Sequence, residues 1–557
     1  EDPPPLTHTL WSSASSGLGL PVDVGSASED EAEHASFVLE HGEELQEHKT
    51  SNAVRVGYGC GGILAYAPNL ITAFFLNPFL LEVAQLDSFL AGCILLIGNI
   101  VDAFTDPLIG FLSDATPWGP KRMPWIGFAI LPFCVFYFWL WLTPPFVQSQ
   151  WGKMVYYTTM YICRTFCLTC IIVPYNSLSA EITPSYDERS RLVGVRWLVS
   201  LGGGSICVVL QSILVEAFKL PDGETDYSKG YAVASIVEVI IFIASALILL
   251  AFVREPEQRK EREKSQFTVV KGVIECLKNV PFLMITVNFT MSYIALSLVS
   301  TNLFLYVKYV VKLEEYYTII LFLVIGSASL AVPCWGLVSV RIGKTRTFYI
   351  GGTGFVLFVG TQTFLPVQPP IAFMFILAIA AGFSLGTLYL IPYSLIPDII
   401  EVDELKTGER REGAYFSLYV FFEKFCLAFA YAITNWILGL SGYESPGDQT
   451  LQQQEDDYQP DSTVLALRIM TGVLPAGMVV VGIIVLCWYP ISKQRHTEIL
   501  EKLAHQRREK AAFLKSKKRQ SLGYNAISPG RDRAGLLSDD SDVDTEVVLS
   551  KRAEATN

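Results

Sequence analysis

Two acidic residues inside one apolar stretch have the clearest chemical potential in this chain. Asp102 and Asp106 lie within the run 88–113, which is long and apolar enough to cross a membrane as a helix. A spacing of four residues places them on one face of that helix, about 6 Å apart along its axis. An ionised Asp at membrane depth costs about 2.5 kcal/mol or more, so such residues typically mark the path of an ion or a substrate. We therefore predict a cation site here.

Hydroxyl groups near the two carboxylates suit the same chemistry. Na⁺ is a hard ion that prefers oxygen donors. Besides the two acids, the hydroxyl of Thr105 or Thr169 is a suitable donor. Two adjacent buried carboxylates repel each other, so an empty site should take up a proton or attract a cation. We therefore expect Na⁺ as the coupling ion, with H⁺ as the alternative coupling ion. We expect no other cofactor.

The composition indicates a membrane protein that positions these acids in a helical bundle. About half of the residues are hydrophobic and only 17% are charged. Apolar runs long enough to span a bilayer recur twelve times. They lie near 56–80, 88–113, 124–143, 153–180, 193–217, 231–252, 281–307, 317–340, 346–366, 371–396, 412–440 and 464–490.

Basic residues gather in the connections that follow even-numbered spans, whereas the loop 442–463 contains no Lys or Arg. The positive-inside rule therefore places both termini in the cytoplasm. No secretory signal is visible, so the first span is expected to serve as its own insertion signal. The predicted organisation is a tail at 1–54, a six-helix half at 55–253, a basic linker at 254–280, a second six-helix half at 281–490 and a tail at 491–557. We expect the plasma membrane, with an endosomal or lysosomal membrane as the alternative.

The two predicted halves repeat short patterns. Gly110-Phe-Leu-Ser-Asp114 corresponds to Gly336-Leu-Val-Ser-Val340, and each closes the second span of its half. Pro174-Tyr175 likewise corresponds to Pro392-Tyr393 near the end of each fourth span. Such duplication is typical of transporters that rock two halves around a site at the midplane.

Other chemistries have little support in the sequence. All six histidines, at 8, 34, 41, 48, 496 and 505, lie outside the apolar runs, which argues against a histidine-ligated metal in the membrane. Cys163, Cys167 and Cys170 are better explained by helix packing than by zinc binding. We expect no enzymatic activity, no nucleic-acid partner and a monomeric protein whose partners are the bilayer, a small amphipathic substrate and a coupling cation.

Several motifs occur in the order found in a known transporter family. They are Asp102-Ala-Phe-Thr105-Asp106-Pro107, Val173-Pro174-Tyr175-Asn176, Asp187-Glu188-Arg189, Pro397-Asp398 and Arg410-Arg411-Glu412-Gly413. On these motifs, residues 55–490 resemble the glycoside-pentoside-hexuronide cation symporters, which are melibiose permease-like. Met123-Pro124-Trp125 and Tyr419–Lys424 resemble the animal sodium-dependent lysophosphatidylcholine symporter branch. The resemblance implies an all-α membrane protein with the twelve-helix major facilitator fold in two six-helix halves.

The cargo is expected to differ from that of the sugar-carrying members. In those permeases two further carboxylates grip the sugar hydroxyls, and the matching positions here are Tyr66 and Ile172. Apolar or aromatic replacements would leave sugar hydroxyls unsatisfied. We therefore do not expect a sugar cargo. The resemblance to the lysophosphatidylcholine symporter branch implies a lysophospholipid such as lysophosphatidylcholine, carried by alternating access. The alternatives are a symporter of a glycoside or other small polar solute, and, from another class, a lipid scramblase or a non-transporting membrane adaptor.

Three basic residues are candidates for coupling or substrate contact. The resemblance implies that Lys424 approaches the cation site from the second half, where it could link ion occupancy to closure or contact a substrate phosphate. Alternatively Lys424 is a fixed salt-bridge partner, and Glu423 could pair with it. Arg164 and Arg196 are further candidates for an anionic group, because a guanidinium offers a planar fork to phosphate oxygens.

Charged residues at predicted helix ends are expected to form cytoplasmic gate pairs that lock an outward-open state, with solvated surface charge as the competing explanation. They are Asp114, Lys121, Arg122, Glu181, Arg189, Asp398, Arg410 and Arg411. In the tail, Asp532 followed by Leu536-Leu537 fits an acidic dileucine signal for sorting adaptors.

Overall fold

The computed structural model describes the chain from residue 50 to residue 506 with gaps. The described residues are 50–114, 116, 122–183, 186–218, 227–255, 275–407, 411–446, 449, 458–491, 494–503 and 505–506, without the side chains at 114, 180, 187, 190 and 412. Most of the predicted N-terminal tail and linker, Lys121, Arg410, the Asp114 side chain and the Leu536-Leu537 motif lie outside them. Every element in this described part is helical, which confirms the predicted all-α class.

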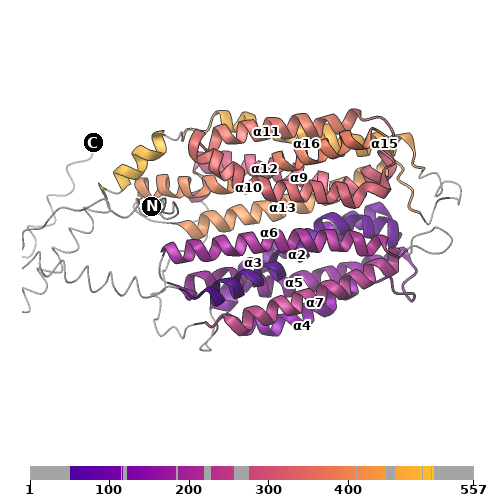
Figure 1. The fold of residues 1–557 in the computed structure, drawn as a ribbon, viewed down its shortest axis with the longest axis horizontal. Helices are drawn as coiled ribbons and strands as arrows, with labels where there is room; N and C mark the ends of the chain where they lie inside the picture. The colour runs from indigo at the N-terminus through magenta and orange to yellow at the C-terminus, as the bar shows by residue number, and fades with distance from the viewer. Residues whose placement is uncertain are drawn as a thin grey trace, which may run out of the picture. The chain divides into compact units, whose positions relative to one another are not determined.

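Six long helices make up what we call the first half, following the predicted division. They are α2 (Asn52–Pro78), which continues into the π-helical turn η1 (Phe79–Val83), α3 (Ser88–Asp114), α4 (Met123–Leu140), α5 (Gln150–Ile182), α6 (Tyr186–Glu216) and α7 (Tyr227–Phe252). We call the end of the bundle where α2 begins the terminal end, and the end where η1 lies the distal end. Figure 1 shows these helices together, coloured indigo to magenta.

The second half repeats this plan with helices that are interrupted more often. They are α9 (Val280–Leu305) with η2 (Tyr306–Val310), η3 (Glu314–Tyr316) with α10 (Tyr317–Ile342), α11 (Lys344–Thr361) with η4 (Gln362–Phe364), α12 (Ile371–Thr407), α13 (Glu412–Leu440), and α15 (Asp461–Arg468) with η5 (Ile469–Val473) and α16 (Leu474–Cys487). The described residues beyond His496, 497–503 and 505–506, are helical and belong to a separate unit.

Eleven helices in the described residues are long and apolar enough to cross a membrane, so the protein is a multi-pass integral membrane protein. Twelve spans were predicted. The segment predicted at 346–366 does form a helix, α11, but Lys344 and Arg346 in its first turn make it less apolar than the others. Its buried face, which includes Phe348 and Phe355, still packs into the core of the second half.

Helix α3 carries the predicted cation site, and local sequence signals define its limits. The Asp87 carboxylate precedes the helix and accepts hydrogen bonds from the backbone N–H groups of Phe89 (2.9 Å) and Leu90 (3.3 Å), as an N-cap residue does. Pro107 lies inside the helix, where it has no N–H to donate to the carbonyl four residues earlier. The missing hydrogen bond, from position 107 to the carbonyl of residue 103, therefore weakens the helical ladder next to both acids.

The two halves meet chiefly where α3 packs against α13, with further contacts of α2 with α9 and of α6 with α10. Near the distal end, the rings of Phe89 and Trp436 stack with centroids 5.6 Å apart. A Cβ atom at Gly92 would lie 3.0 Å from the Trp436 indole, so a larger residue would press on α13 at this close approach of α3 and α13. The contact brings residues from distant parts of the chain to one interface.

Candidate functional site

The structure places a lysine from the second half between the two predicted carboxylates of the first half. The Lys424 ammonium on α13 lies 2.6 Å from Asp102 Oδ2 and 2.5 Å from Asp106 Oδ2. The side chains of Asp102, Asp106 and Lys424 are 18%, 23% and 22% exposed, so the group is mostly buried but can still be reached by solvent. We call these three residues the triad. It is an interaction across the two halves.

The two predicted hydroxyl donors are placed differently. The Thr169 hydroxyl on α5 donates to Asp102 Oδ1 at 3.0 Å and so adds an oxygen beside the carboxylates. The Thr105 hydroxyl donates to the Asp102 backbone carbonyl at 3.1 Å, within its own helix. The structure therefore brings together Asp102, Asp106 and Thr169, an oxygen-rich set that suits a hard cation.

Glu423 is not an ion-pair partner of Lys424. Among the described residues the ammonium of Lys424 pairs with the two aspartates, and no ion pair joins it to Glu423. Successive helical residues point about 100° apart, which separates the two side chains. The alternative pairing of Lys424 with Glu423 is therefore not the one observed.

The two predicted arginines differ in accessibility. Arg164 on α5 is 1% exposed, and its Nε and Nη2 have no hydrogen-bond partner among the described residues. Its neighbours include the tyrosines at 137 and 161, so it lies within the first half and is closed to a ligand in this conformation. Arg196 on α6 is only partly buried, donates to Asn176 Oδ1 at 2.7 Å and lies over the Trp197 ring.

The positions that carry sugar-gripping acids in the resembling permeases are lined by apolar groups. Tyr66 on α2 contacts the Trp197 ring edge-on, with centroids 6.4 Å apart. Ile172 on α5 packs against the hydrophobic core of the first half. Neither side chain offers a carboxylate to the hydroxyls of a sugar.

The predicted gate residues form ion pairs within each half. In the first half, Arg122 Nε lies 3.0 Å from Glu181 Oε1, and Arg189 donates to the Thr183 carbonyl at 3.5 Å. In the second half, Arg411 pairs with Asp403 at 2.9 Å and also contacts Glu275. Burial opposes it, but these carboxylates raise the pKa of Arg411. These pairs lie within single halves, so a gate that joins the halves at the terminal end stays a prediction.

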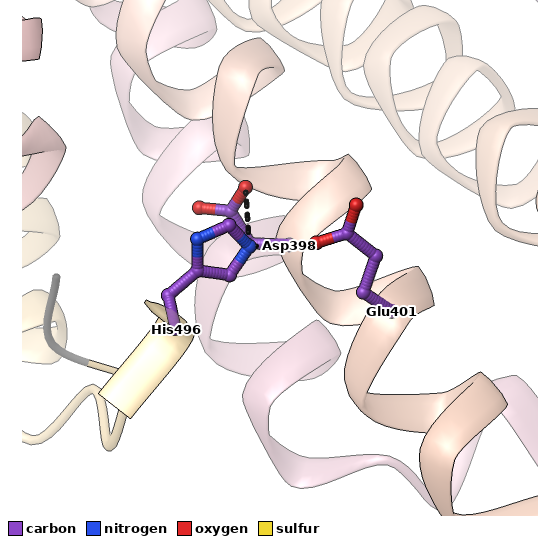
Figure 2. A group of neighbouring side chains, drawn as sticks. All are labelled: Asp398, Glu401 and His496. Atoms are coloured by element: carbon purple, nitrogen blue, oxygen red, sulfur yellow. Dashed lines mark hydrogen bonds and ion pairs between the residues drawn. The ribbon is translucent and has the colours of Figure 1, made fainter. Parts of the chain in front are cut away.

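Asp398 belongs to a second cluster at the terminal end, shown in Figure 2. His496 Nε2 lies 2.6 Å from Glu401 Oε2 and 3.6 Å from Asp398 Oδ1. The geometry could hold a metal ion. However, the Lys344 ammonium already lies 2.6 Å from Asp398 Oδ1, and this positive charge disfavours a metal there. We interpret the cluster as an ion-pair network that attaches the segment after α16 to α12.

The distal end holds a group of residues that the sequence did not single out. Glu82 in η1 accepts hydrogen bonds from Lys308 (2.9 Å) and Tyr309 (2.8 Å) of η2, and from Tyr443 after α13. We call these four residues the distal contact. It joins the two halves, because Glu82 belongs to the first half and the other three to the second. The sequence signal that could have pointed to this contact is a glutamate, Glu82, and a lysine, Lys308, at the ends of two corresponding apolar runs.

A cavity of about 410 Å³ lies behind the distal contact and is bordered by both halves. Two hydrogen bonds lie beside this cavity. The Tyr227 hydroxyl donates to Glu314 Oε1 at 2.7 Å, and the Thr318 hydroxyl donates to Glu216 Oε1 at 2.7 Å. Each bond joins the first half to the second. These bonds and the distal contact hold the two halves together at the distal end.

Comparisons with known proteins agree with this architecture. The sequence model of the family described as MFS/sugar transport protein matches residues 57–493. The chain is 29% identical to the sodium-dependent lysophosphatidylcholine symporter 1-A of Danio rerio over 81% of this chain and 88% of that protein. It is 25% identical to the sphingosine-1-phosphate transporter MFSD2B of Mus musculus over 84% of this chain and 95% of that protein.

Solved structures support the fold. The crystal structure of nucleoside transporter NupG matches with a TM-score of 0.55 at 12% identity, over 79% of this chain and all of that chain. This likeness confirms the predicted major facilitator architecture. Since the family match also spans most of the sequence, the chain belongs to the MFS/sugar transport protein family.

Proposed function

We propose that this protein is a sodium-coupled symporter that carries a lysophospholipid by alternating access. The observation that carries the proposal is the triad, in which a lysine of one half lies between two carboxylates of the other. A sodium ion and the Lys424 ammonium would compete for the same oxygens. Ion binding would therefore release a contact between the halves, which is a direct way to bias a conformational equilibrium.

The direction of opening follows from the two ends of the bundle. The distal contact ties the halves together, while Arg122–Glu181 and Arg411–Asp403 pair within single halves at the terminal end. If basic residues mark the cytoplasmic side, the terminal end faces the cytoplasm and the distal contact closes the side away from it. Sodium, the lipid or both would then favour the outward-open state. The shift in the equilibrium is limited by how much more tightly they bind that state than the state described here.

The cargo proposal rests on the residue types at positions 66 and 172 and on the named relatives. Tyr66 and Ile172 offer aromatic and apolar surface, which suits an acyl chain better than a sugar. The Danio rerio relative is named for lysophosphatidylcholine and the Mus musculus relative for sphingosine-1-phosphate, both single-chain phospholipids. Partly buried Arg196 is a suitable partner for a phosphate.

Uptake by cells that express the protein tests this proposal. Labelled lysophosphatidylcholine and a labelled disaccharide are supplied in Na⁺ or K⁺ medium at one pH. We expect Na⁺-dependent uptake of the lipid and none of the disaccharide. Disaccharide uptake would favour a glycoside symporter, and lipid movement at equal rates in both media would favour a scramblase. A membrane adaptor would move neither.

Weakening the distal contact should expose the distal cavity. In Glu82→Gln the charge-assisted bond to Lys308 is lost, which costs about 1–3 kcal/mol and shifts the closed-to-open ratio about 5- to 150-fold. A cysteine introduced at Phe304, which lines the cavity, should then react faster with a membrane-impermeant maleimide. Glu444→Gln, at the same end, is the matched control. An unchanged labelling rate in Glu82→Gln would refute the role of the distal contact.

A further inference from the structure

The cavity at the distal end lies apart from the triad and has no part in the cation chemistry described there. Its volume of about 410 Å³ is that of a small-molecule site, and far larger than a bare ion needs. Both halves border it, since Phe75 belongs to α2 of the first half and Phe304 to α9 of the second. A molecule bound in this cavity would therefore touch both halves.

Carboxyl groups outnumber amino groups in the described lining of the cavity. The lining contains one lysine, Lys308, and four glutamates, which are Glu82, Glu216, Glu314 and Glu315. The lysine is already paired, because its ammonium lies 2.9 Å from Glu82 Oε2. Two of the other glutamates accept hydrogen bonds from hydroxyl groups, which carry no charge. One ammonium does not neutralise four carboxylates, so this lining attracts a cation.

A buried tyrosine hydroxyl in the same lining points independently to a ligand. Tyr317, the first residue of α10, borders the cavity and is only 2% exposed. Its hydroxyl has no hydrogen-bond partner among the residues that the structure describes. Buried hydroxyl groups are ordinarily hydrogen-bonded. An unpaired hydroxyl in a cavity wall therefore calls for an occupant with a hydrogen-bonding group.

Aromatic rings from both halves surround this tyrosine. The Tyr317 ring lies edge to face with Phe304, with centroids 5.1 Å apart, and with Phe75, with centroids 6.3 Å apart. Both phenylalanines border the cavity. Such rings offer apolar surface to an aromatic body, and their faces attract a cation.

These features together select one class of ligand. An ammonium group has three N–H donors, which suit carboxylates and a tyrosine hydroxyl. A metal ion would leave most of the cavity and its aromatic surface unused. A lysophospholipid would bring a phosphate, which the excess of carboxylates repels. The cavity is therefore chemically unlike a site for the proposed cargo.

We propose that the distal cavity binds a protonated organic amine with an aromatic body. Its ammonium lies among the glutamates and the Tyr317 hydroxyl, and its ring packs against Phe75 and Phe304. Binding does not depend on the proposed transport function. Because the amine touches both halves, it stabilises the described state relative to one in which the distal end opens.

Thermal stabilisation of the purified full chain tests this site. The probes are tryptamine and tryptophol, which has the same indole ring but a hydroxyl in place of the amine. We expect saturable stabilisation by tryptamine and at least about tenfold weaker binding of tryptophol. Changing Glu314→Gln and Glu315→Gln together should weaken tryptamine binding about tenfold. Glu444→Gln, at the same end but outside the described lining, is the control and should leave it unchanged.

Three results would overturn the site. They are the absence of saturable tryptamine binding, equal binding of the two probes, and full tryptamine affinity in the double variant. Saturating lysophosphatidylcholine should not displace tryptamine, and displacement would place the amine in a cargo site instead. None of these measurements requires transport, so their failure is distinguishable from failure of the proposed function.

Tyr317→Phe separates contact with the ligand from a structural role, and it decides the question if the double variant does not fold. The substitution keeps the ring and removes a hydroxyl that has no partner in the described part of the protein. The ligand-free protein should therefore unfold at the same temperature or a higher one, while tryptamine binds about fivefold more weakly. Lower stability without ligand, or unchanged tryptamine affinity, would contradict the proposal.

Discussion

Asp102→Asn and Asp106→Asn should each abolish Na⁺-driven uptake of lysophosphatidylcholine while leaving expression intact. The two carboxylates lie on one helix and share one ammonium, that of Lys424, at 2.6 and 2.5 Å. An amide keeps the shape of the side chain but removes its charge, so a hard cation loses its main attraction. Uptake and Na⁺-dependent binding of the lipid are the measurements.

The matched control for these variants is Asp461→Asn, which changes an exposed acid at the start of α15. It should transport normally. Full Na⁺-dependent uptake in both Asp102→Asn and Asp106→Asn would show that the coupling ion binds elsewhere. Loss of expression in either variant would instead indicate a structural role.

Lys424→Met should also abolish coupled uptake, but for a different reason. Removal of the ammonium leaves two adjacent carboxylates without their partner, and breaking a buried ion pair costs about 3–5 kcal/mol. Sodium no longer competes with the Lys424 ammonium for the carboxylates, so it should bind more tightly. Ion binding, however, no longer releases a contact between the two halves. We expect raised Na⁺ affinity in a binding assay, together with loss of transport by a factor of 100 or more.

Lys406→Ala, at an exposed position near the end of α12, is the control for Lys424→Met and should behave as the unmodified protein. If Lys424 were only a fixed salt-bridge partner that permits insertion, Lys424→Met would express poorly. In that case the protein that does reach the membrane would transport normally. Unchanged Na⁺ affinity would contradict direct competition between the ion and the ammonium.

The carboxylate pair was predictable because charges are rare in apolar runs. Two acids four residues apart must share a helix face, whatever the rest of the fold does. The place of Lys424 opposite them was available only from the resemblance, since it depends on how α3 and α13 pack. Thr105 and Thr169 were not distinguishable in the sequence. A helical threonine often donates to a carbonyl in its own helix, as Thr105 does.

The distal contact was not predictable from the sequence for a physical reason. Glu82 and Lys308 lie at the ends of apolar runs, where charged residues are ordinarily solvated. Their pairing depends on the relative tilt of the two halves, which no local pattern encodes. The same reason explains why the predicted gate residues Arg122, Glu181 and Asp398 were found in pairs within single halves.

Gradient-driven accumulation tests most directly whether the ion and the lipid move together. The purified protein is placed in liposomes, and labelled lysophosphatidylcholine is added outside with an inward Na⁺ gradient or an equal K⁺ gradient, at one pH on both sides. Coupled symport predicts that the lipid accumulates above its equilibrium level with Na⁺ only, and that Asp106→Asn removes this excess. Equal lipid levels under both gradients would contradict sodium coupling.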